Sequence, residues 1–322
     1  MKFVDDAMDR VDRFQRHHRW AAFPLAVVKK FGDDGAGNLA SLLALYGFLS
    51  MFLLLMVFVT ILGIVLQGNS ELTDKLVHSV LGQFPVIGDQ IKVHSLHRSG
   101  LALVIGIVGG LYSGLSVIRV AQMSMDEVWD VPKKLRPDFM SSIVRALLML
   151  AVAGAAVVGA TVLSGLAAAA SGFGVWAKIG GIVGATALNI GVFLLSFRIL
   201  TVARVTWRDV LPGAILAGVT WEILLLSGAY LVGHQIKNAS AVYGVFALVI
   251  GLLWWLKMGA QVTLYGAEVN VVRTRHLWPR GLRERSEADE VTLRREAMQE
   301  ERVEDEKVDV RFERDRVSGY EP

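Results

Sequence analysis

Two charged residues and several other polar residues lie inside stretches of the chain that are otherwise apolar. Among the residues of this chain, these are the best candidates for a functional site. Glu222 and Lys257 each carry a full charge well within such a stretch. A charge at mid-bilayer costs roughly 3 kcal/mol or more, so it faces a partner or a wet cavity. The accompanying polar groups are Asn189, Gln261, Tyr265, Glu268 and Asn270. Groups of these types can relay a proton or an ion, or line the path of a solute.

Glu222 and Lys257 lie at matching depths if both segments are helices. At ~1.5 Å per residue, Glu222 lies about 18–20 Å from the start of its helix near Asp209. Lys257 lies about 16 Å from the end of its own helix near Glu268. We therefore predict that the two side chains approach each other inside a helical bundle and form an ion pair.

Four polar residues of the last apolar stretch follow one another at helical spacing. Steps of four, four and three residues place them on one face of a helix. These residues are Lys257, Gln261, Tyr265 and Glu268. Such a stripe can line a cavity, or it can join neighbouring helices by hydrogen bonds. The sequence leaves both interpretations open.

The motifs of an intramembrane hydrolase are missing from the sequence. It contains no His-Glu-x-x-His zinc motif, no Gly-x-Ser-x-Gly turn and no cysteine. Of the seven histidines, only His94 and His97 stand three apart in one segment, and two imidazoles do not complete a zinc site. We therefore expect no catalytic site, no metal and no cofactor, and any active group would be a proton or ion relay around Glu222 and Lys257.

The polar residues must be positioned by apolar helices that cross a membrane. Hydrophobic residues make up 53% of the 322 residues, and the mean hydropathy is +0.48. Several uncharged stretches reach the ~20 residues that span a bilayer core, and continuous apolar runs of this length are helices rather than strands of a barrel. The sequence predicts an all-α, polytopic membrane protein with six transmembrane helices, over residues 41–66, 99–120, 143–168, 175–199, 209–232 and 242–266.

Lysine and arginine gather in every second connecting segment, which sets the expected orientation. The rich segments are 1–38, 119–145 and 198–208, and the poor ones are 67–98, 169–174 and 233–241. Because cytoplasmic loops carry the excess of cations, we expect both termini in the cytoplasm. The net charge of +3 does not indicate nucleic-acid binding, since the cations sit beside helix ends and the C-terminal tail alternates both signs.

Three segments of different character divide the chain. Residues 1–38 form an N-terminal cytoplasmic segment whose first part, around 3–14, has the pattern of an amphipathic helix that lies on the membrane or packs on the cytoplasmic loops. Residues 39–272 form the six-helix domain, in which the loop at 72–84 is expected to be a short helical cap. Residues 273–322 form a charged cytoplasmic tail that reads as solvated helix or disordered chain.

Small residues recur at four-residue spacing within the expected helices. In lipid, helices associate through close packing of small residues rather than through the hydrophobic effect. The strictest stripe is Gly106, Gly110 and Gly114, and similar stripes include Gly180 with Gly184 and Gly213 with Ala217. They predict a tightly packed bundle, or equally a face between copies in an oligomer. They are not phosphate-binding loops, because no such motif follows a strand.

Several runs of the membrane domain resemble those of a known family. They are Phe23-Pro24-Leu25, Tyr46-Gly47-Phe48-Leu49-Ser50, Trp207-Arg208-Asp209-Val210-Leu211-Pro212-Gly213-Ala214, Trp221-Glu222, Leu253-Trp254-Trp255 and Tyr265-Gly266-Ala267-Glu268-Val269-Asn270. On these residues the chain resembles the YihY/BrkB family of bacterial inner-membrane proteins, over roughly residues 20–272. It departs from the family pattern at Lys257, where an uncharged residue is expected, and residues 281–322 lie outside the resemblance.

The resemblance implies a multi-pass protein of the bacterial inner membrane, linked by name to virulence and long labelled as ribonuclease BN. The sequence argues against that label, because it lacks the His-x-His-x-Asp-His run that binds zinc in the soluble ribonucleases that trim transfer RNA. A membrane-bound ribonuclease is therefore the last of three hypotheses, and no nucleic-acid partner is expected.

The first hypothesis is a transport-related protein for a lipid or a small solute such as an osmolyte. Its cavity would be lined by helices four to six. The polar residues in its wall would be Asn189, Glu222, Lys257, Gln261, Tyr265, Glu268 and Asn270. The second is an envelope scaffold that transports nothing and in which the same residues only join helices. Membrane lipids are the expected partners in both cases, and an oligomer is compatible with either.

Overall fold

The computed structural model describes residues 18–65, 100–169, 174–203, 205–235, 241–281 and 291–296. Within these ranges the chain is helical and contains no strand. The all-α prediction is therefore confirmed for the described part. The expected amphipathic helix around 3–14 and the expected cap at 72–84 lie outside the described residues, as does most of the C-terminal tail.

Each of the six expected transmembrane ranges falls on one observed helix, and the observed helices are mostly longer. They are α3 (Ala36–Val65), α5 (Gly100–Val128), α6 (Phe139–Ala169), α7 (Val175–Leu200), α8 (Trp207–Gln235) and α9 (Ala241–Arg275). A helix that the sequence analysis did not separate, α2 (Arg19–Asp33), precedes them. The short 3-10 helix η2 (Lys133–Leu135) lies between α5 and α6, and residues 291–296 form one further helical segment.

Three helical stretches in the described part of the chain are long and apolar enough to cross a bilayer. They are Phe139–Leu163 of α6, Val175–Leu200 of α7 and Trp207–Ser227 of α8. Ala36–Met51 of α3 is a shorter apolar helix. The count of six crossings and the cytoplasmic position of the termini remain predictions.

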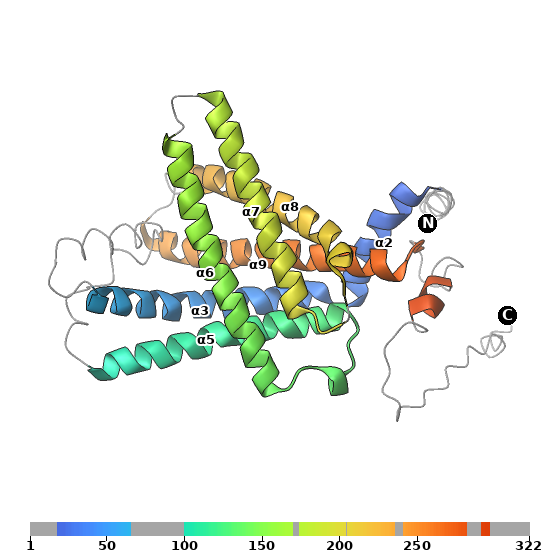
Figure 1. Cartoon of the computed structure of the whole chain (residues 1–322), viewed down its shortest axis with the longest axis horizontal. Helices are drawn as coiled ribbons and strands as arrows, with labels where there is room; N and C mark the ends of the chain where they lie inside the picture. The colour runs from blue at the N-terminus through green and yellow to red at the C-terminus, as the bar shows by residue number, and fades with distance from the viewer. Residues whose placement is uncertain are drawn as a thin grey trace.

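The helices are arranged as two packed groups (Figure 1). α3 packs against both α5 and α9, and the three run side by side. α6 and α7 form a hairpin that crosses this group at a steep angle, and α8 packs between α7 and α9. α2, the end of α9 and the segment 291–296 all lie at one end of the molecule. The described parts that adjoin the two termini are therefore neighbours.

Local sequence explains where two of the helices begin. α2 and α3 are separated by a turn in which Gly35 has φ +61°, a conformation that glycine adopts without strain. At the start of α8, both the backbone N–H and the hydroxyl of Thr206 donate to the Asp209 carboxylate, at 2.7 Å each. α8 therefore begins at Trp207, and Pro212 lies inside the helix.

The buried core and the exposed apolar surface occupy different parts of the molecule. Fully buried apolar side chains such as Phe197, Leu264 and Val271 belong to one cluster near the end of the bundle where α2 packs. By contrast, α6 exposes large apolar side chains, with Val157 67% and Leu166 62% exposed. An apolar helix with an exposed apolar surface is what contact with lipid requires.

Candidate functional site

The polar residues inside the bundle meet, but not in the pairing that the sequence predicted. The side-chain amide of Asn189, on α7, donates to Glu222 Oε2, on α8, at 2.9 Å. Among the ion pairs of the described residues, none joins Glu222 to Lys257. Glu222 therefore has a neutral partner on α7, and the predicted ion pair across α8 and α9 is wrong.

The faces of α8 explain this outcome. Trp221 points towards α9, since a Cβ on Gly259 would come within 2.5 Å of its ring. Gly218 lies against α7, where a Cβ would meet the Ile190 side chain at 2.6 Å. Glu222 is one turn beyond Gly218 and one residue, or about 100°, away from Trp221, so it shares the face that contacts α7. The depths of Glu222 and Lys257 along their helices could be estimated from the sequence, but the direction in which the Glu222 side chain points around the α8 axis could not.

The α9 stripe is partly exposed at one end and fully buried at the other. Lys257 and Gln261 are half-buried, and neither makes a side-chain hydrogen bond or ion pair to another described residue. Tyr265 stacks on Phe31 of α2, with ring centroids 3.9 Å apart and an interplanar angle of 6°. Glu268 is completely buried. The stripe thus leads from the middle of α9 to its contact with α2.

Asn270 joins α8 to α9 at their closest approach. Its Oδ1 accepts a hydrogen bond from the backbone N–H of Gly213 at 2.7 Å, in the second turn of α8 and directly after Pro212. The two backbones approach so closely that a Cβ on Gly213 would lie 1.9 Å from the carbonyl oxygen of Gly266. The predicted role of Gly213 in tight packing is therefore confirmed, and Asn270 is an interhelical link.

The stripe of Gly106, Gly110 and Gly114 lies on α5, which packs against α3. Its packing role stays a prediction, because the side-chain surroundings of Gly106 and Gly110 fall outside the described residues. Closely packed glycines do occur between α6 and α7, where a Cβ on Gly184 would meet Leu163 at 2.9 Å. Gly180, on the same expected stripe, has nothing within 4 Å of such an atom.

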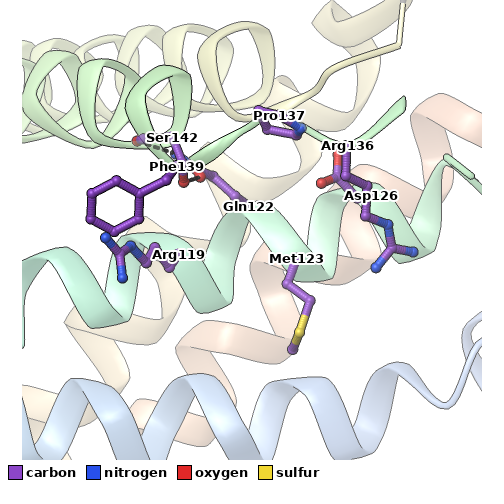
Figure 2. Close-up of a pocket in the computed structure, with 8 residues that line it drawn as sticks. All are labelled: Arg119, Gln122, Met123, Asp126, Arg136, Pro137, Phe139 and Ser142. Atoms are coloured by element: carbon purple, nitrogen blue, oxygen red, sulfur yellow. Dashed lines mark hydrogen bonds between the residues drawn. The ribbon is translucent and has the colours of Figure 1, made fainter. Parts of the chain in front are cut away.

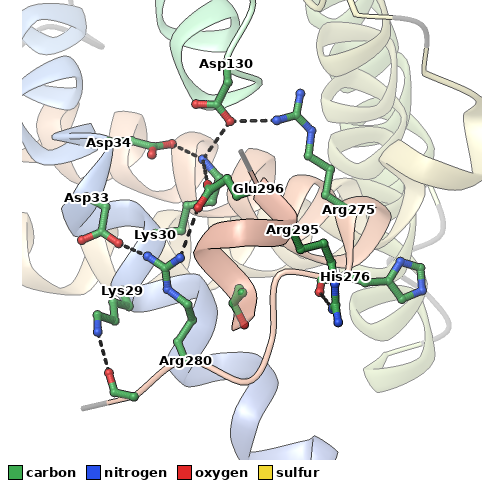
Figure 3. Close-up of polar contacts among 12 residues, drawn as sticks. Lys29, Lys30, Asp33, Asp34, Asp130, Arg275, His276, Arg280, Arg295 and Glu296 are labelled. Carbon is green, nitrogen blue, oxygen red and sulfur yellow. Dashed lines mark hydrogen bonds and ion pairs between the residues drawn. The ribbon is translucent and has the colours of Figure 1, made fainter. Parts of the chain in front are cut away.

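Glu268 belongs to a buried charge cluster that the sequence analysis did not find, and Figure 3 shows the groups around Lys30 in this cluster. At its centre is Lys30 of α2, whose side chain is 2% exposed. The ammonium lies 2.6 Å from Asp34 Oδ2, 3.6 Å from Asp130 Oδ2 and 3.9 Å from Glu268 Oε2. It also donates to the carbonyl of Val128 at 3.2 Å, at the C-terminal end of α5 where a helix dipole favours a cation.

Further ion pairs connect this cluster to the segments around it. Arg275, at the end of α9, binds Asp130 at 2.8 Å. Arg280 contacts Asp33 of α2, and its second nitrogen lies 3.2 Å from Glu296 of the 291–296 segment. Figure 3 shows these groups converging from α2, the turn after α5, and the chain on both sides of residue 280. The cluster therefore joins α2 and the turn after α5 to the end of α9 and the segment 291–296.

Asp130 reaches this position because of the way α5 ends. Its φ is +50°, a left-handed conformation that aspartate tolerates better than most residues. The backbone N–H of Val131 then bonds to the carbonyl of Asp126 at 2.8 Å, which closes the helix end. The turn directs the Asp130 carboxylate towards both Lys30 and Arg275.

Burial and mutual repulsion shift the protonation of the cluster, which lies beyond the expected transmembrane ranges. Burial raises the pKa of Asp34 to about 6, although the Lys30 charge and hydrogen bond oppose the shift. Burial also raises the pKa of Glu268 well above its usual value, against the pull of Lys30 and with the support of Asp34. Burial alone would lower the pKa of Lys30, but Glu268, Asp34 and Asp130 outweigh it and raise that pKa.

Because the pKa of both Glu268 and Asp34 is raised, these two carboxyl groups can share one proton. Neither oxygen of Glu268 has a hydrogen-bond donor among the described residues, as expected where two ionised carboxylates face each other. With one proton on Glu268, its hydroxyl can donate to Asp34, and this interaction favours the protonated form of Glu268. Chemically, the pair can hold and release a proton beside a permanent cation.

One pocket of about 300 Å³ lies away from all of these groups, between α5 and the start of α6 (Figure 2). It is lined by Arg119, Gln122, Met123, Asp126, Arg136, Pro137, Phe139 and Ser142. The wall of this pocket contains none of the residues predicted to line a cavity. Within the described ranges, no three His, Cys, Asp or Glu residues are arranged to hold a metal ion.

The apolar helices and their exposed apolar surfaces define the class of protein: it is a membrane protein whose described part is all-helical. The chain belongs to the BrkB family, because residues 27–290 match the family described as virulence factor BrkB. The family suggested by the sequence runs is thereby confirmed.

A curated relative agrees with this assignment. The chain is 33% identical over 94 residues to a UPF0761 membrane protein of Paraburkholderia xenovorans (strain LB400). The match covers 29% of the chain and spans about a fifth of the relative's length, 21%. No solved structure matches the chain.

Proposed function

We propose that the chain is a multi-pass transport protein of the bacterial inner membrane, for a small solute such as an osmolyte or for a lipid. Its path follows the faces of α7, α8 and α9 that carry Asn189, Glu222, Lys257 and Gln261. The observation that carries the proposal is the hydrogen bond between Asn189 and Glu222, far from either end of two apolar helices. A charged group at such a depth is costly, and function is the usual reason for it.

The proposed topology has six crossings and both termini in the cytoplasm. It is supported by the alternation of helix ends: α2, the turn from α5 to α6, the turn from α7 to α8 and the end of α9 lie at one end (Figure 1). Lysine and arginine are concentrated in these same segments, as expected of cytoplasmic loops.

The proton-holding pair fits at the cytoplasmic end of the proposed path. Glu268 ends the α9 stripe and faces Asp34 and Lys30, where its protonation depends on its neighbours. In the proposal, Glu222 is the ionisable group within the bilayer, and Glu268 with Asp34 is the group that exchanges protons on the cytoplasmic side. Transport would then be coupled to proton movement.

An envelope scaffold is the second candidate, and specific contacts favour it. Asn270 is committed to a backbone hydrogen bond, and Tyr265 is stacked on Phe31. Two of the residues predicted to line a path therefore join helices. In this candidate the Asn189–Glu222 bond is a third such link.

The E222Q and E222M variants separate the two candidates. Glutamine keeps the oxygen that accepts from Asn189 but cannot ionise, whereas methionine removes the hydrogen bond and keeps the volume. Purified protein is reconstituted into vesicles that contain a pH-sensitive dye, and proton movement is measured after a step in osmolyte concentration. Helical content and thermal unfolding are measured in parallel.

For a transporter, E222Q lowers the coupled proton flux by roughly tenfold or more and unfolds at the wild-type temperature. K178Q is the matched control, since Lys178 is an exposed cation near the start of α7, and its flux stays at the wild-type level. If E222Q has wild-type flux while E222M is destabilised, Glu222 is a structural link and the transport path is wrong. A wild-type protein that moves neither protons nor osmolyte contradicts this coupled form of transport.

A further inference from the structure

The pocket between α5 and α6 has opposite charges at its two ends. Arg119, Gln122, Met123 and Asp126 follow steps of three, one and three residues, so they share one face of α5. Figure 2 shows Arg119 beside Phe139 on one side of Gln122, and Asp126 beside Arg136 on the other. A hydrogen-bonded pair, Gln122 with Ser142, lies between the two ends and joins α5 to α6.

Neither end group forms an ion pair with another described residue. The Arg119 guanidinium lies over the Phe139 ring at 4.6 Å from its centroid, and no carboxylate of the described chain is within ion-pair distance. Asp126 is 3% exposed, and its Oδ1 has no hydrogen-bond partner among the described residues. Arg136, by contrast, already binds Glu127 at 2.8 Å. Arg119 is thus left without an ion pair, and Asp126 keeps one oxygen without a hydrogen bond although Arg136 and Arg145 act on its charge.

Burial without a partner has a measurable consequence for Asp126. Its pKa is raised to about 6 by burial, although Arg136 and Arg145 act in the opposite direction. A buried carboxylate with an unsatisfied oxygen costs free energy that a donated hydrogen bond from a cation would recover. The pocket therefore suits a molecule with an ammonium group at one end and an anion at the other.

The position of the pocket indicates where such a molecule would come from. Arg119 stands at the end of the expected 99–120 span, and Phe139 begins the apolar stretch Phe139–Leu163 of α6. The pocket thus lies at the level of lipid headgroups, on the cytoplasmic side in the proposed topology. Phe139, Met140 and Met123 are 63%, 66% and 40% exposed beside it, so acyl chains have apolar surface to contact.

We propose that this pocket binds the headgroup of a phospholipid with a primary ammonium group, as in phosphatidylethanolamine, with Arg119 at the phosphate and Asp126 at the ammonium. The inference uses the membrane placement given under Proposed function but not the transport step. The bound lipid can be a fixed ligand of the protein whether or not the protein transports anything.

Lipid retention by the purified full-length chain tests the proposal. The protein is mixed in detergent with equal amounts of phosphatidylethanolamine, phosphatidylcholine and phosphatidylglycerol, and retained lipids are counted by native mass spectrometry. Phosphatidylcholine has the same phosphate but a trimethylated nitrogen that donates no hydrogen bond, and phosphatidylglycerol has no cation. The wild type is expected to retain phosphatidylethanolamine about tenfold better than either, the effect of one charge-assisted hydrogen bond.

Two variants assign the ends of the headgroup. D126N removes the preference for phosphatidylethanolamine, so that the three lipids are retained about equally. R119Q weakens the retention of all three by roughly tenfold, since each has a phosphate. Thermal unfolding confirms that each variant is folded, and because the two substitutions predict different patterns, loss of folding in one leaves the other as a test.

Matched controls use the same residue types outside the pocket. Asp138 is exposed and caps α6, a role that asparagine also fills, so D138N keeps the wild-type preference. Arg208 is an exposed cation at the start of α8, and R208Q likewise changes nothing. Equal retention of phosphatidylethanolamine and phosphatidylcholine by the wild type, or an unchanged preference in D126N, overturns the proposal. If the protein retains free phosphoethanolamine but no phospholipid, the claim that the ligand is a membrane lipid is wrong.

Discussion

At the scale of single residues, Lys30 is the centre of the buried charge cluster. Its ammonium has four acids within 4 Å, Asp34, Asp130, Glu268 and Glu296, and is almost fully buried. The sequence offered one signal for it, the i,i+4 spacing of Lys30 and Asp34, but surface pairs at this spacing are common and usually contribute little. The other partners, Asp130, Glu268 and Glu296, lie far from Lys30 in the sequence, so no local pattern could have predicted the cluster. Glu268 itself was singled out as part of the polar stripe on α9, but its partners in the cluster were not predicted.

The protonation of this cluster predicts a pH-dependent stability. A carboxyl group whose pKa is raised by folding stabilises the protein fully below its unfolded pKa and loses that contribution as the pH rises through the folded pKa. For Asp34, with an ordinary pKa of 3.8 and a folded pKa of about 6, the window runs from pH 4 to 6. Glu268 is shifted in the same direction and extends the loss to higher pH.

Replacement of Glu268 by glutamine tests this prediction, because glutamine resembles the protonated acid and can donate to Asp34. We expect E268Q to match the wild type near pH 5 and to be more stable at pH 8, by about 1–3 kcal/mol, the cost of one unsatisfied buried group. Thermal unfolding in detergent across this pH range is the measurement. E127Q, at an exposed carboxylate, should follow the wild-type curve. A variant that is less stable than the wild type at every pH would show that Glu268 is stably ionised.

At the scale of elements, the positions of the helices were predictable and their contacts were not. Apolar length alone placed all six ranges on observed helices, because a bilayer-spanning run has a strong sequence signal. The partner of Glu222 depends on how α8 is rotated, which is set by Trp221 against Gly259 and by Gly218 against Ile190. Such contacts arise from three helices at once, so the sequence of one helix could not reveal them.

The contact of α8 with α9 predicts the effect of one methyl group. In G213A the new Cβ would lie 1.9 Å from the Gly266 carbonyl oxygen, so the helices must separate and the Asn270 hydrogen bond must lengthen. We expect a loss of about 1–3 kcal/mol or more in the free energy of unfolding. G251A on α9 is the control, since nothing lies within 4 Å of its Cβ, and it should be neutral or slightly stabilising. Equal stability of the two variants, measured by denaturant unfolding, would contradict the packing role of Gly213.

At the scale of the whole molecule, the charge cluster and the apolar helices serve different requirements. The helices expose apolar surface that needs lipid, whereas the cluster holds α2, the end of α5 and the end of α9 together where the described parts of both termini lie. Ionised groups in such numbers require an aqueous boundary nearby. The proposed topology, with six crossings and this end in the cytoplasm, would satisfy both requirements, and the distribution of cations is the one it predicts.

Labelling of single cysteines tests this topology most directly, because the chain contains no cysteine of its own. A membrane-impermeant thiol reagent is applied to intact cells whose outer membrane has been permeabilised, and again after lysis. Cysteines that replace Lys92, Lys178 and Lys237 should react in intact cells, whereas those that replace Lys133, Arg208 and Arg273 should react only after lysis. The opposite pattern, or the same reactivity on both sides of any one helix, would contradict six crossings with cytoplasmic ends.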